Sequence, residues 1–176
     1  MFLIIKEKLE IVVPILESGF IYNILFNEKI SEDLESYRTI LGFNANHGYM
    51  ISLVSGESQE GTHMTNAVGS SVRLQSHYQE IRESLKSYFP CIVGTVMSNK
   101  IAVLVPYEKD NMEYNERIEL IDKARELVRY LRRKTGISFR IGISGVKELG
   151  ELRESYNEAL HALVNTTSSV EIPILG

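Results

Sequence analysis

The sequence is poor in the features that mark secreted, nucleic-acid-binding and membrane-spanning proteins. Cys91 is the only cysteine among 176 residues, so no disulfide can form within the chain and a reducing, cytoplasmic setting is expected. Lysine and arginine number 19 against 23 aspartates and glutamates, and this balance gives no support to direct nucleic-acid binding. The apolar start, MFLIIKEKLEIVVPIL, carries charges at positions 6, 7, 8 and 10. It therefore reads neither as a membrane span nor as a signal peptide.

Sequence patterns for catalytic and metal chemistry are also missing. The four histidines, at positions 47, 63, 77 and 161, show no HxxxH or HExxH spacing, and no CxxC pair occurs, so no metal site is predicted. The glycines form neither a GxxxxGK[ST] nor a GxGxxG loop, and no serine stands in a GxSxG context. From these patterns we predict no catalytic residue and no cofactor.

What is present is a regular alternation of helical and strand patterns. Pro14 is expected to kink the first helix or to divide it in two, and Gly42 and Gly136 are placed to end helices. Apolar residues that recur every three or four positions predict helices, and short apolar runs predict strands. The predicted helices cover residues 5–26, 31–41, 71–88, 116–134 and 147–163; the predicted strands cover 49–54, 91–96, 101–105, 139–144 and the terminal run VEIPIL.

From residue 49 onward the predicted order is β-α-β-β-α-β-α-β, which indicates an α+β, ferredoxin-like arrangement. We expect a mainly antiparallel sheet with the helices covering one of its faces. Pro173 favours a sheet edge for the last strand. The chain would then divide into an N-terminal helical segment, residues 1–45, and a sheet domain, residues 46–176.

The predicted hairpin carries a family resemblance. Its tip and second strand, MSNKIAVLVP at residues 97–106, are similar to GGDEFAVLLP, the signature of diguanylate cyclases, whose nucleotide cyclase-like fold has the same element order. On that alignment Met97 and Ser98 occupy the two glycine places, Asn99 and Lys100 replace the acidic pair, and Ile101 replaces the phenylalanine.

The departures from the signature imply that the domain is a degenerate, non-catalytic member of that group. Glycines let a backbone approach a nucleotide closely, and Met97 would fill that space. The acidic pair serves Mg²⁺, which prefers oxygen ligands, whereas Lys100 carries the wrong charge. The strand at residues 49–54 also lacks the metal-binding aspartate of the cyclases. The inhibitory RxxD site would fall on residues 88–91, which read YFPC, so product binding is not expected either.

Three further segments resemble the GGDEF-like domains of bacterial transcription regulators: ILESGFIYNILFNE, YRTILGFNANHGYMISLV and FRIGISGVKELGELRESYNEALHAL. With the hairpin, the resemblance covers residues 8–173. In the related two-component response regulators such a domain lies between a receiver and an AraC-type helix-turn-helix. The resemblance implies that the chain is part of a longer regulator, whose missing domains receive the signal and bind DNA.

Two roles follow for such a domain. The first is signal relay and dimerisation, in which the helical stripe Ile5, Leu9, Val12 and Leu16 would contact a second copy. The same stripe could instead pack on the domain's own sheet, and the sequence does not separate these alternatives.

The second role is that of a small-molecule sensor that reuses the former nucleotide cleft. By position in the fold, the cleft residues would be Ser52, Asn99, Lys100 and Arg140. Ordinary hairpin and strand surface explains the same residues, since nothing in the sequence marks a pocket.

Overall fold

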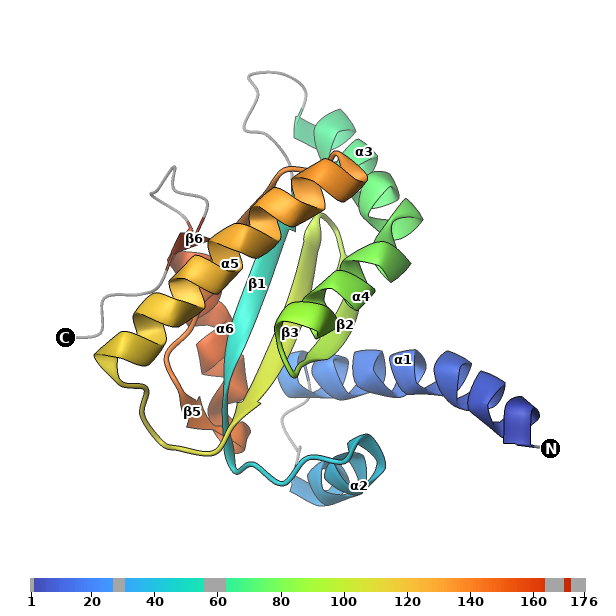
Figure 1. Cartoon of the computed structure of the whole chain (residues 1–176), viewed down its shortest axis with the longest axis vertical. Helices are drawn as coiled ribbons and strands as arrows, with labels where there is room; N and C mark the ends of the chain where they lie inside the picture. Colours follow the sequence, from blue (N-terminus) through green and yellow to red (C-terminus); the bar gives the residue numbers. More distant parts are fainter. Residues whose placement is uncertain (1, 27–30, 56–62, 164–169, 172–176) are drawn as a thin grey trace.

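The computed structural model describes residues 2–26, 31–55, 63–163 and 170–171, and it describes side chains for residues 11–26, 35–55 and 69–163. A twisted sheet stands at the centre with helices around it (Figure 1). The helices are α1 (Phe2–Phe26), α2 (Ser31–Leu41), α3 (His63–Ser76), α4 (Tyr78–Tyr88), α5 (Tyr114–Thr135) and α6 (Leu152–His161), with a 3-10 turn, η1, at Leu149–Glu151; the strands are β1 (His47–Ser55), β2 (Ile92–Met97), β3 (Lys100–Tyr107), β4 (Phe139–Ile143), β5 (Lys147–Glu148) and β6 (Val170–Glu171).

The strands form one sheet in the order β2-β3-β1-β4-β6, with β5 paired to the start of β1. Every pairing is antiparallel except that of β4 with β6. This arrangement confirms the predicted α+β, nucleotide cyclase-like fold. The final strand pairs only with β4 and ends the sheet order, as predicted for an edge, whereas Pro173 lies outside the described residues.

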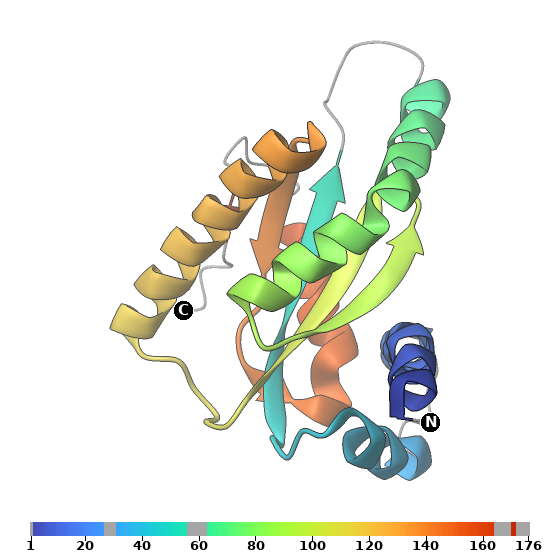
Figure 2. The same cartoon turned by 45° about the vertical axis from the view of Figure 1, so that its right-hand side comes forward.

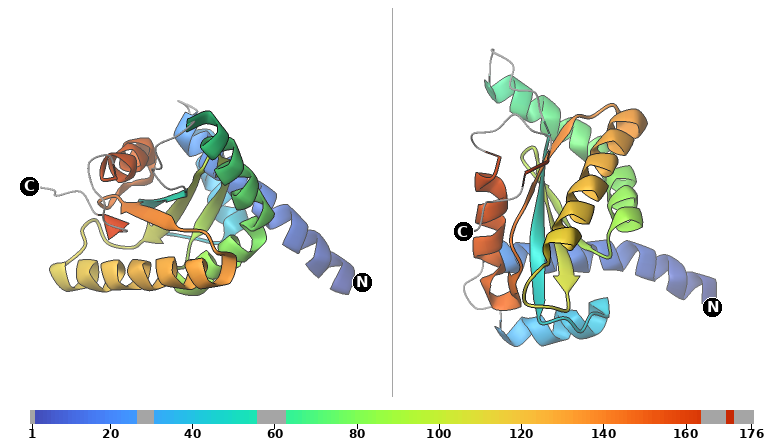
Figure 3. Two further views of the ribbon diagram at one scale, coloured as in Figure 1. Left: turned by 90° about the horizontal axis from the view of Figure 1, so that it is seen from above. Right: turned by 60° about the vertical axis from the view of Figure 1, so that its left-hand side comes forward.

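Helices cover both faces of the sheet, which corrects the prediction that they would cover one (Figure 3). Ile51 and Leu53 of β1 belong to a core shared with α3, α4 and α5. Met50, one position away on the opposite face of the strand, belongs to a second core shared with α1 and the start of α6. The reason is visible in β1, since Met50, Ile51 and Leu53 are all fully buried and a strand that is apolar on both faces needs two covering layers.

Three helix boundaries differ from prediction. The helix predicted at 71–88 is two helices, α3 and α4, which meet at His77. The helix predicted at 147–163 begins only at Leu152, because Lys147 and Glu148 pair with the start of β1, and sheet pairing there overrides the helical pattern. The helix α1 runs unbroken through Pro14, so the division that Pro14 suggested is wrong.

The predicted helix terminators are confirmed. Gly42 has φ +75° and Gly136 has φ +74°, the left-handed conformation that glycine adopts without steric cost. In each case the glycine N–H donates to a carbonyl four residues earlier, Arg38 O and Arg132 O, at 2.9 Å. These bonds close α2 and α5.

The N-terminal helix has two different surroundings along its length. Its C-terminal half lies against the sheet and α6, whereas its N-terminal half extends away from the rest of the molecule (Figures 1 and 3). Figure 2 views α1 nearly along its axis. Although α1 is 25 residues long, the described part of the chain contains no helix that is long and apolar enough to cross a membrane.

Candidate functional site

The tip of the β2–β3 hairpin is a tight turn of two residues, shorter than the gap of residues 97–100 between the two predicted strands. Met97 and Lys100 pair across the hairpin, which leaves Ser98 and Asn99 as the turn. Ser98 has φ +60°, and a positive φ at the first central position is typical of a type II′ turn, where glycine is preferred. Met97, at the first glycine position of the signature, is therefore a strand residue. Ser98, at the second glycine position, is the turn residue with the left-handed backbone.

Asn99 fastens this tip to the end of β1. Its side-chain Nδ2 donates to the carbonyl of Ser55 at 2.5 Å, and the Ser55 N–H donates to the Asn99 carbonyl at 2.9 Å. The amide at the first acidic place is thus engaged in a local structural contact.

Met97, just before the turn, and Ile101, two residues after it, face opposite cores. Met97 is partly buried and packs against the core that contains Phe20 and Ile21 of α1. Ile101 is fully buried in the other core, beneath α3 to α5. The methionine at the first glycine position of the signature therefore packs against the core beneath α1; whether it excludes a nucleotide stays a prediction.

The predicted cleft residues lie in two neighbouring rows across the sheet. Val54 of β1 is paired with Lys100 on one side and with Arg140 on the other, so the two cations share one row and one face. Ser52 occupies the next row and is fully buried. The structure therefore places Lys100 and Arg140 on one face at the same end of the sheet, with Ser52 in the next row of that face. The side-chain amide of Asn99 instead donates to the Ser55 carbonyl.

Side chains and backbone from the α6 region already occupy part of this face. Nη2 of Arg140 donates to the Leu163 carbonyl at 2.8 Å. Tyr156 of α6 faces Ser52: burial raises the pKa of the Tyr156 phenol, and the nearby Ser52 hydroxyl opposes that rise. A Cβ on Gly142 would stand 1.9 Å from the Ala159 carbonyl oxygen, so α6 lies directly on the sheet there.

The donor set at this end of the sheet does not fit Mg²⁺. That ion prefers carboxylate and other oxygen ligands in octahedral geometry, whereas the row nearest the tip carries Lys100 and Arg140. Among the residues whose positions are described, no group of three or more His, Cys, Asp or Glu side chains could hold a metal ion.

The opposite end of the sheet has two cavities, of about 380 and 280 Å³, which share Phe89, Pro90 and Pro106 in their walls. This is the region in which the resemblance places the inhibitory site of cyclases. Its charged side chains are Lys86 in the larger cavity, and Glu116, Glu119 and Lys123 in the smaller one. The arginine and aspartate of an RxxD motif are absent from residues 88–91.

The most deeply buried charge that the structure describes was missed from the sequence. Glu17 of α1 is 2% exposed; it accepts a hydrogen bond from Arg82 at 2.7 Å and forms an ion pair with Lys86 at 2.9 Å, both on α4. The backbone N–H of Val93 in β2 donates to its other oxygen at 2.9 Å. We call these four residues the Glu17 anchor. The only sequence signal was a single acid within an otherwise uncharged stretch, residues 11–26.

Cys91 lies beside the Glu17 anchor. Lys86 Nζ donates to the Cys91 carbonyl at 2.9 Å. Burial raises the pKa of the Cys91 thiol to about 12, and the nearby Lys86 ammonium acts in the opposite direction. The thiol is therefore a buried, protonated group.

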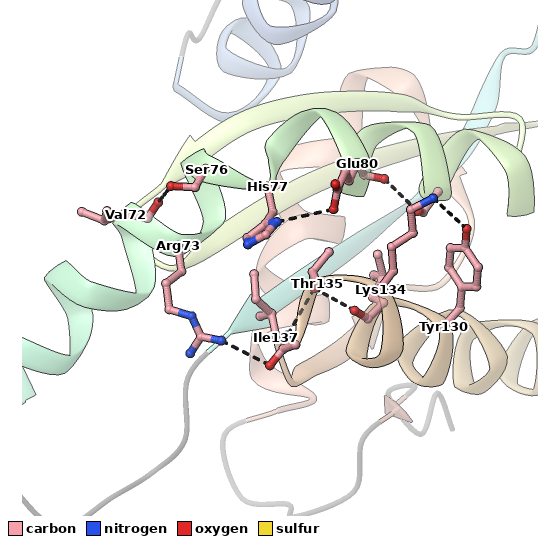
Figure 4. A network of polar contacts seen from close by, with 12 residues as sticks. Val72, Arg73, Ser76, His77, Glu80, Tyr130, Lys134, Thr135 and Ile137 are labelled. Atoms are coloured by element: carbon pink, nitrogen blue, oxygen red, sulfur yellow. Dashed lines mark hydrogen bonds and ion pairs between the residues drawn. The ribbon is translucent and has the colours of Figure 1, made fainter.

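The surface where α3, α4 and α5 meet carries polar contacts within these helices and a contact between α3 and the end of α5 (Figure 4). Arg73 donates to the Gly136 carbonyl at 3.2 Å, and His77 lies 3.4 Å from Glu80. Lys134 donates to the Tyr130 hydroxyl at 3.3 Å, and this bond raises the pKa of Lys134. Each of these side chains serves a local contact within or between elements.

The structure describes the side chains of two of the four residues predicted for a partner helix. Val12 is 43% exposed and Leu16 is partly buried. The side chains of Ile5 and Leu9 lie outside the part that the structure describes. The predicted stripe therefore stays a prediction, as does the division of the chain at residue 45.

Comparison with known proteins agrees with this geometry. Residues 27–164 match the GGDEF-like domain family, and no curated protein was found to match the chain. The matched stretch includes α2, the hairpin and α6 and covers well over half of the sequence. The chain belongs to the GGDEF-like domain family.

Proposed function

We propose that the chain is a non-catalytic regulatory domain of a bacterial transcription regulator, which relays a signal to a DNA-binding domain. The observation that carries this proposal is the hairpin tip, where Met97, Asn99 and Ile101 of the signature have structural roles. Met97 packs in a core, and Asn99 is bonded to the end of β1. These contacts support a structural, non-catalytic role for the hairpin tip.

Charge supports the proposal that the domain is not an enzyme. Phosphoryl transfer of the cyclase type depends on metal ions held by carboxylates. Lys100 and Arg140 flank Val54 in the row beneath the tip, and two cations there would oppose a divalent metal.

The attachment of α1 supports the relay. The helix enters from the N-terminal side of the matched family region, and Glu17 ties it to both α4 and β2. A displacement of α1 would therefore be transmitted to two elements of the domain at once. In our proposal a receiver lies upstream, an AraC-type helix-turn-helix lies downstream and contacts DNA, and the regulator is a cytoplasmic response regulator.

The reading frame around this chain tests the regulatory role. A receiver encoded before residue 1 and a helix-turn-helix encoded after residue 176 would support it. A frame that encodes this domain alone, or fuses it to an unrelated enzyme, would contradict it. With the full-length protein, Glu17→Gln should alter the response of DNA binding to receiver phosphorylation, whereas Glu83→Gln on the exposed side of α4 should not.

A sensor role is the second candidate, and the shared row of Lys100 and Arg140 favours it because two cations on one face suit an anionic ligand. A thermal-shift screen with nucleotides and anionic metabolites tests this role, since a specific ligand raises the unfolding midpoint. A true ligand should lose its effect in Lys100→Gln and keep it in Lys134→Gln, a matched change of an exposed lysine on α5.

A further inference from the structure

The helix α5 presents a row of exposed side chains on the outside of the molecule (Figure 3). We call this row the α5 stripe; its members are Tyr114, Ile118, Arg125, Arg129 and Arg132. They follow one another in steps of four, seven, four and three residues, which places them within a sector of about 60° and along about 27 Å of an α-helix. A different set of side chains fixes α5 to the domain: Leu120, Ala124, Leu127, Leu131 and Thr135, all buried.

The arginines of the α5 stripe are not explained by the local structure. Arg125 and Arg129 stand four residues apart, and like charges at this spacing destabilise a helix. None of the three arginines forms an ion pair with a carboxylate among the described residues. Arg132 lies in the last turn of α5, where a cation complements the helix dipole, whereas Arg125 and Arg129 precede that turn. The structure therefore shows two exposed guanidinium groups with no role inside the domain.

We propose that the α5 stripe is a docking surface for an acidic helix of another protein, which lies along α5. A guanidinium group donates two parallel hydrogen bonds to a carboxylate. Carboxylates three and four residues apart share one face of a helix, so such a face would meet the three arginines in succession. At the other end of the stripe, Tyr114 is 76% and Ile118 is 40% exposed, and apolar side chains of the partner would cover them. Tyrosine and arginine are enriched among the residues that carry binding energy at protein interfaces.

The charges around the α5 stripe favour a protein helix over a nucleic acid. Asp122 and Glu126 are exposed on α5 beside the arginines. A nucleic-acid duplex is wider than a single helix, so its phosphates would approach these carboxylates as well as the arginines. The apolar end of the stripe has no counterpart on a phosphate backbone, and the net charge of the chain is −4. A helix with an acidic face and an apolar end matches both halves of the stripe.

This inference goes beyond the proposed regulatory function and does not depend on it. The relay is attributed to α1 and the Glu17 anchor, whereas the docking surface lies on α5. Docking is measured with the isolated chain, whereas the regulatory role is read from the reading frame and from DNA binding. Failure of one proposal therefore leaves the other to be decided by its own measurement.

The experiment measures, by fluorescence anisotropy, the binding of synthetic helical peptides to the purified chain. Each peptide carries glutamates on one face in steps of four and three, with two leucines either before or after them, so that both orientations are tested. One orientation should bind, and added salt should weaken its binding because exposed ion pairs are screened. Arg125→Gln and Arg129→Gln should each raise the dissociation constant about three- to fivefold, the loss of one exposed ion pair. Lys134→Gln, the same charge change on another side of α5, is the matched control and should leave binding unchanged.

Exchange of charge between the two partners is the decisive arm. Arg129→Glu should bind the acidic peptide more weakly than Arg129→Gln does, because like charges would then face each other. A peptide whose central glutamate is replaced by lysine should bind Arg129→Glu more tightly than it binds the unmodified chain. The proposal is overturned if neither orientation of the peptide binds, or if Lys134→Gln weakens binding as much as Arg129→Gln. It is also overturned if a double-stranded oligonucleotide binds through these arginines more tightly than either peptide.

Discussion

The hairpin tip and the Glu17 anchor are both polar sites at the edge of a core, yet they differ in burial and in what they join. At the tip, Ser98 is exposed and Asn99 is bonded to the neighbouring strand end. In the anchor, a nearly inaccessible carboxylate joins α1 to α4 and β2 through two charge-assisted hydrogen bonds and an ion pair. The site that carries the family signature is thus a local turn, while a site outside the signature fixes the N-terminal helix.

The largest expected effect comes from breaking the anchor. Glu17→Ala leaves Arg82, Lys86 and the Val93 N–H without their buried acceptor, and removal of one member of a buried pair costs about 3–5 kcal/mol. Lys86 retains partial solvent access, so we expect the lower end, about 3 kcal/mol of unfolding free energy. Urea denaturation of Glu17→Ala and of Glu83→Ala, an exposed control on α4, measures this. A cost below that of an ordinary surface substitution would contradict the anchor.

The buried Cys91 thiol beside the Glu17 anchor should make the stability of the fold depend on pH in the alkaline range. Below pH 9 the thiol is protonated in both states. Because burial raises its folded pKa from 9.0 to about 12, the unfolded chain releases a proton between those values that the folded chain keeps. Stability is therefore fully present below pH 9 and falls as pH rises toward 12, by up to about 1.4 kcal/mol per pH unit from this group. The unfolding free energy of Cys91→Ala should fall less steeply with rising alkaline pH than that of the unmodified chain. An unchanged slope would contradict a raised pKa for the buried thiol.

A substitution at the hairpin tip should cost less unfolding free energy than Glu17→Ala. Asn99→Ala removes the hydrogen bond to the Ser55 carbonyl, which is partly accessible to solvent, and should cost about 1 kcal/mol. Denaturation of this variant beside Asn157→Ala, on the exposed side of α6, measures the difference. A cost as large as that of Glu17→Ala would remove the distinction between the two sites.

The smallest expected change, at Ser98, is a gain in stability and not a loss. Ser98→Gly places glycine at φ +60° and should raise stability by about 0.5 kcal/mol, since relief of backbone strain exceeds the added freedom of the unfolded chain. Ser98→Val should lower it, because a β-branched side chain tolerates that conformation poorly. Thermal unfolding of both variants checks the order, and a stabilising valine would mean that the turn is not as described.

The sequence predicts the fold class here because β1, the hairpin and α5 have clear apolar periods, and Gly42 and Gly136 mark helix ends. The sequence does not predict contacts between residues that lie far apart along the chain. Lys147 and Glu148 lie in a helical pattern, yet they pair with β1. Glu17 has no motif, and its partners on α4 stand 65 or more residues away. Of the cleft residues, Lys100 and Arg140 are brought together, whereas the burial of Ser52 could not be read from a strand that is apolar on both faces.

The central claim is that the signature hairpin is structural and not catalytic, and incubation of the purified chain with GTP and Mg²⁺ tests it most directly. Product analysis should find only unreacted GTP, equal to a sample without protein, for the unmodified chain and for Ser98→Gly. Formation of a cyclic dinucleotide by the unmodified chain, lost in Lys100→Gln or Asn99→Ala, would contradict the claim.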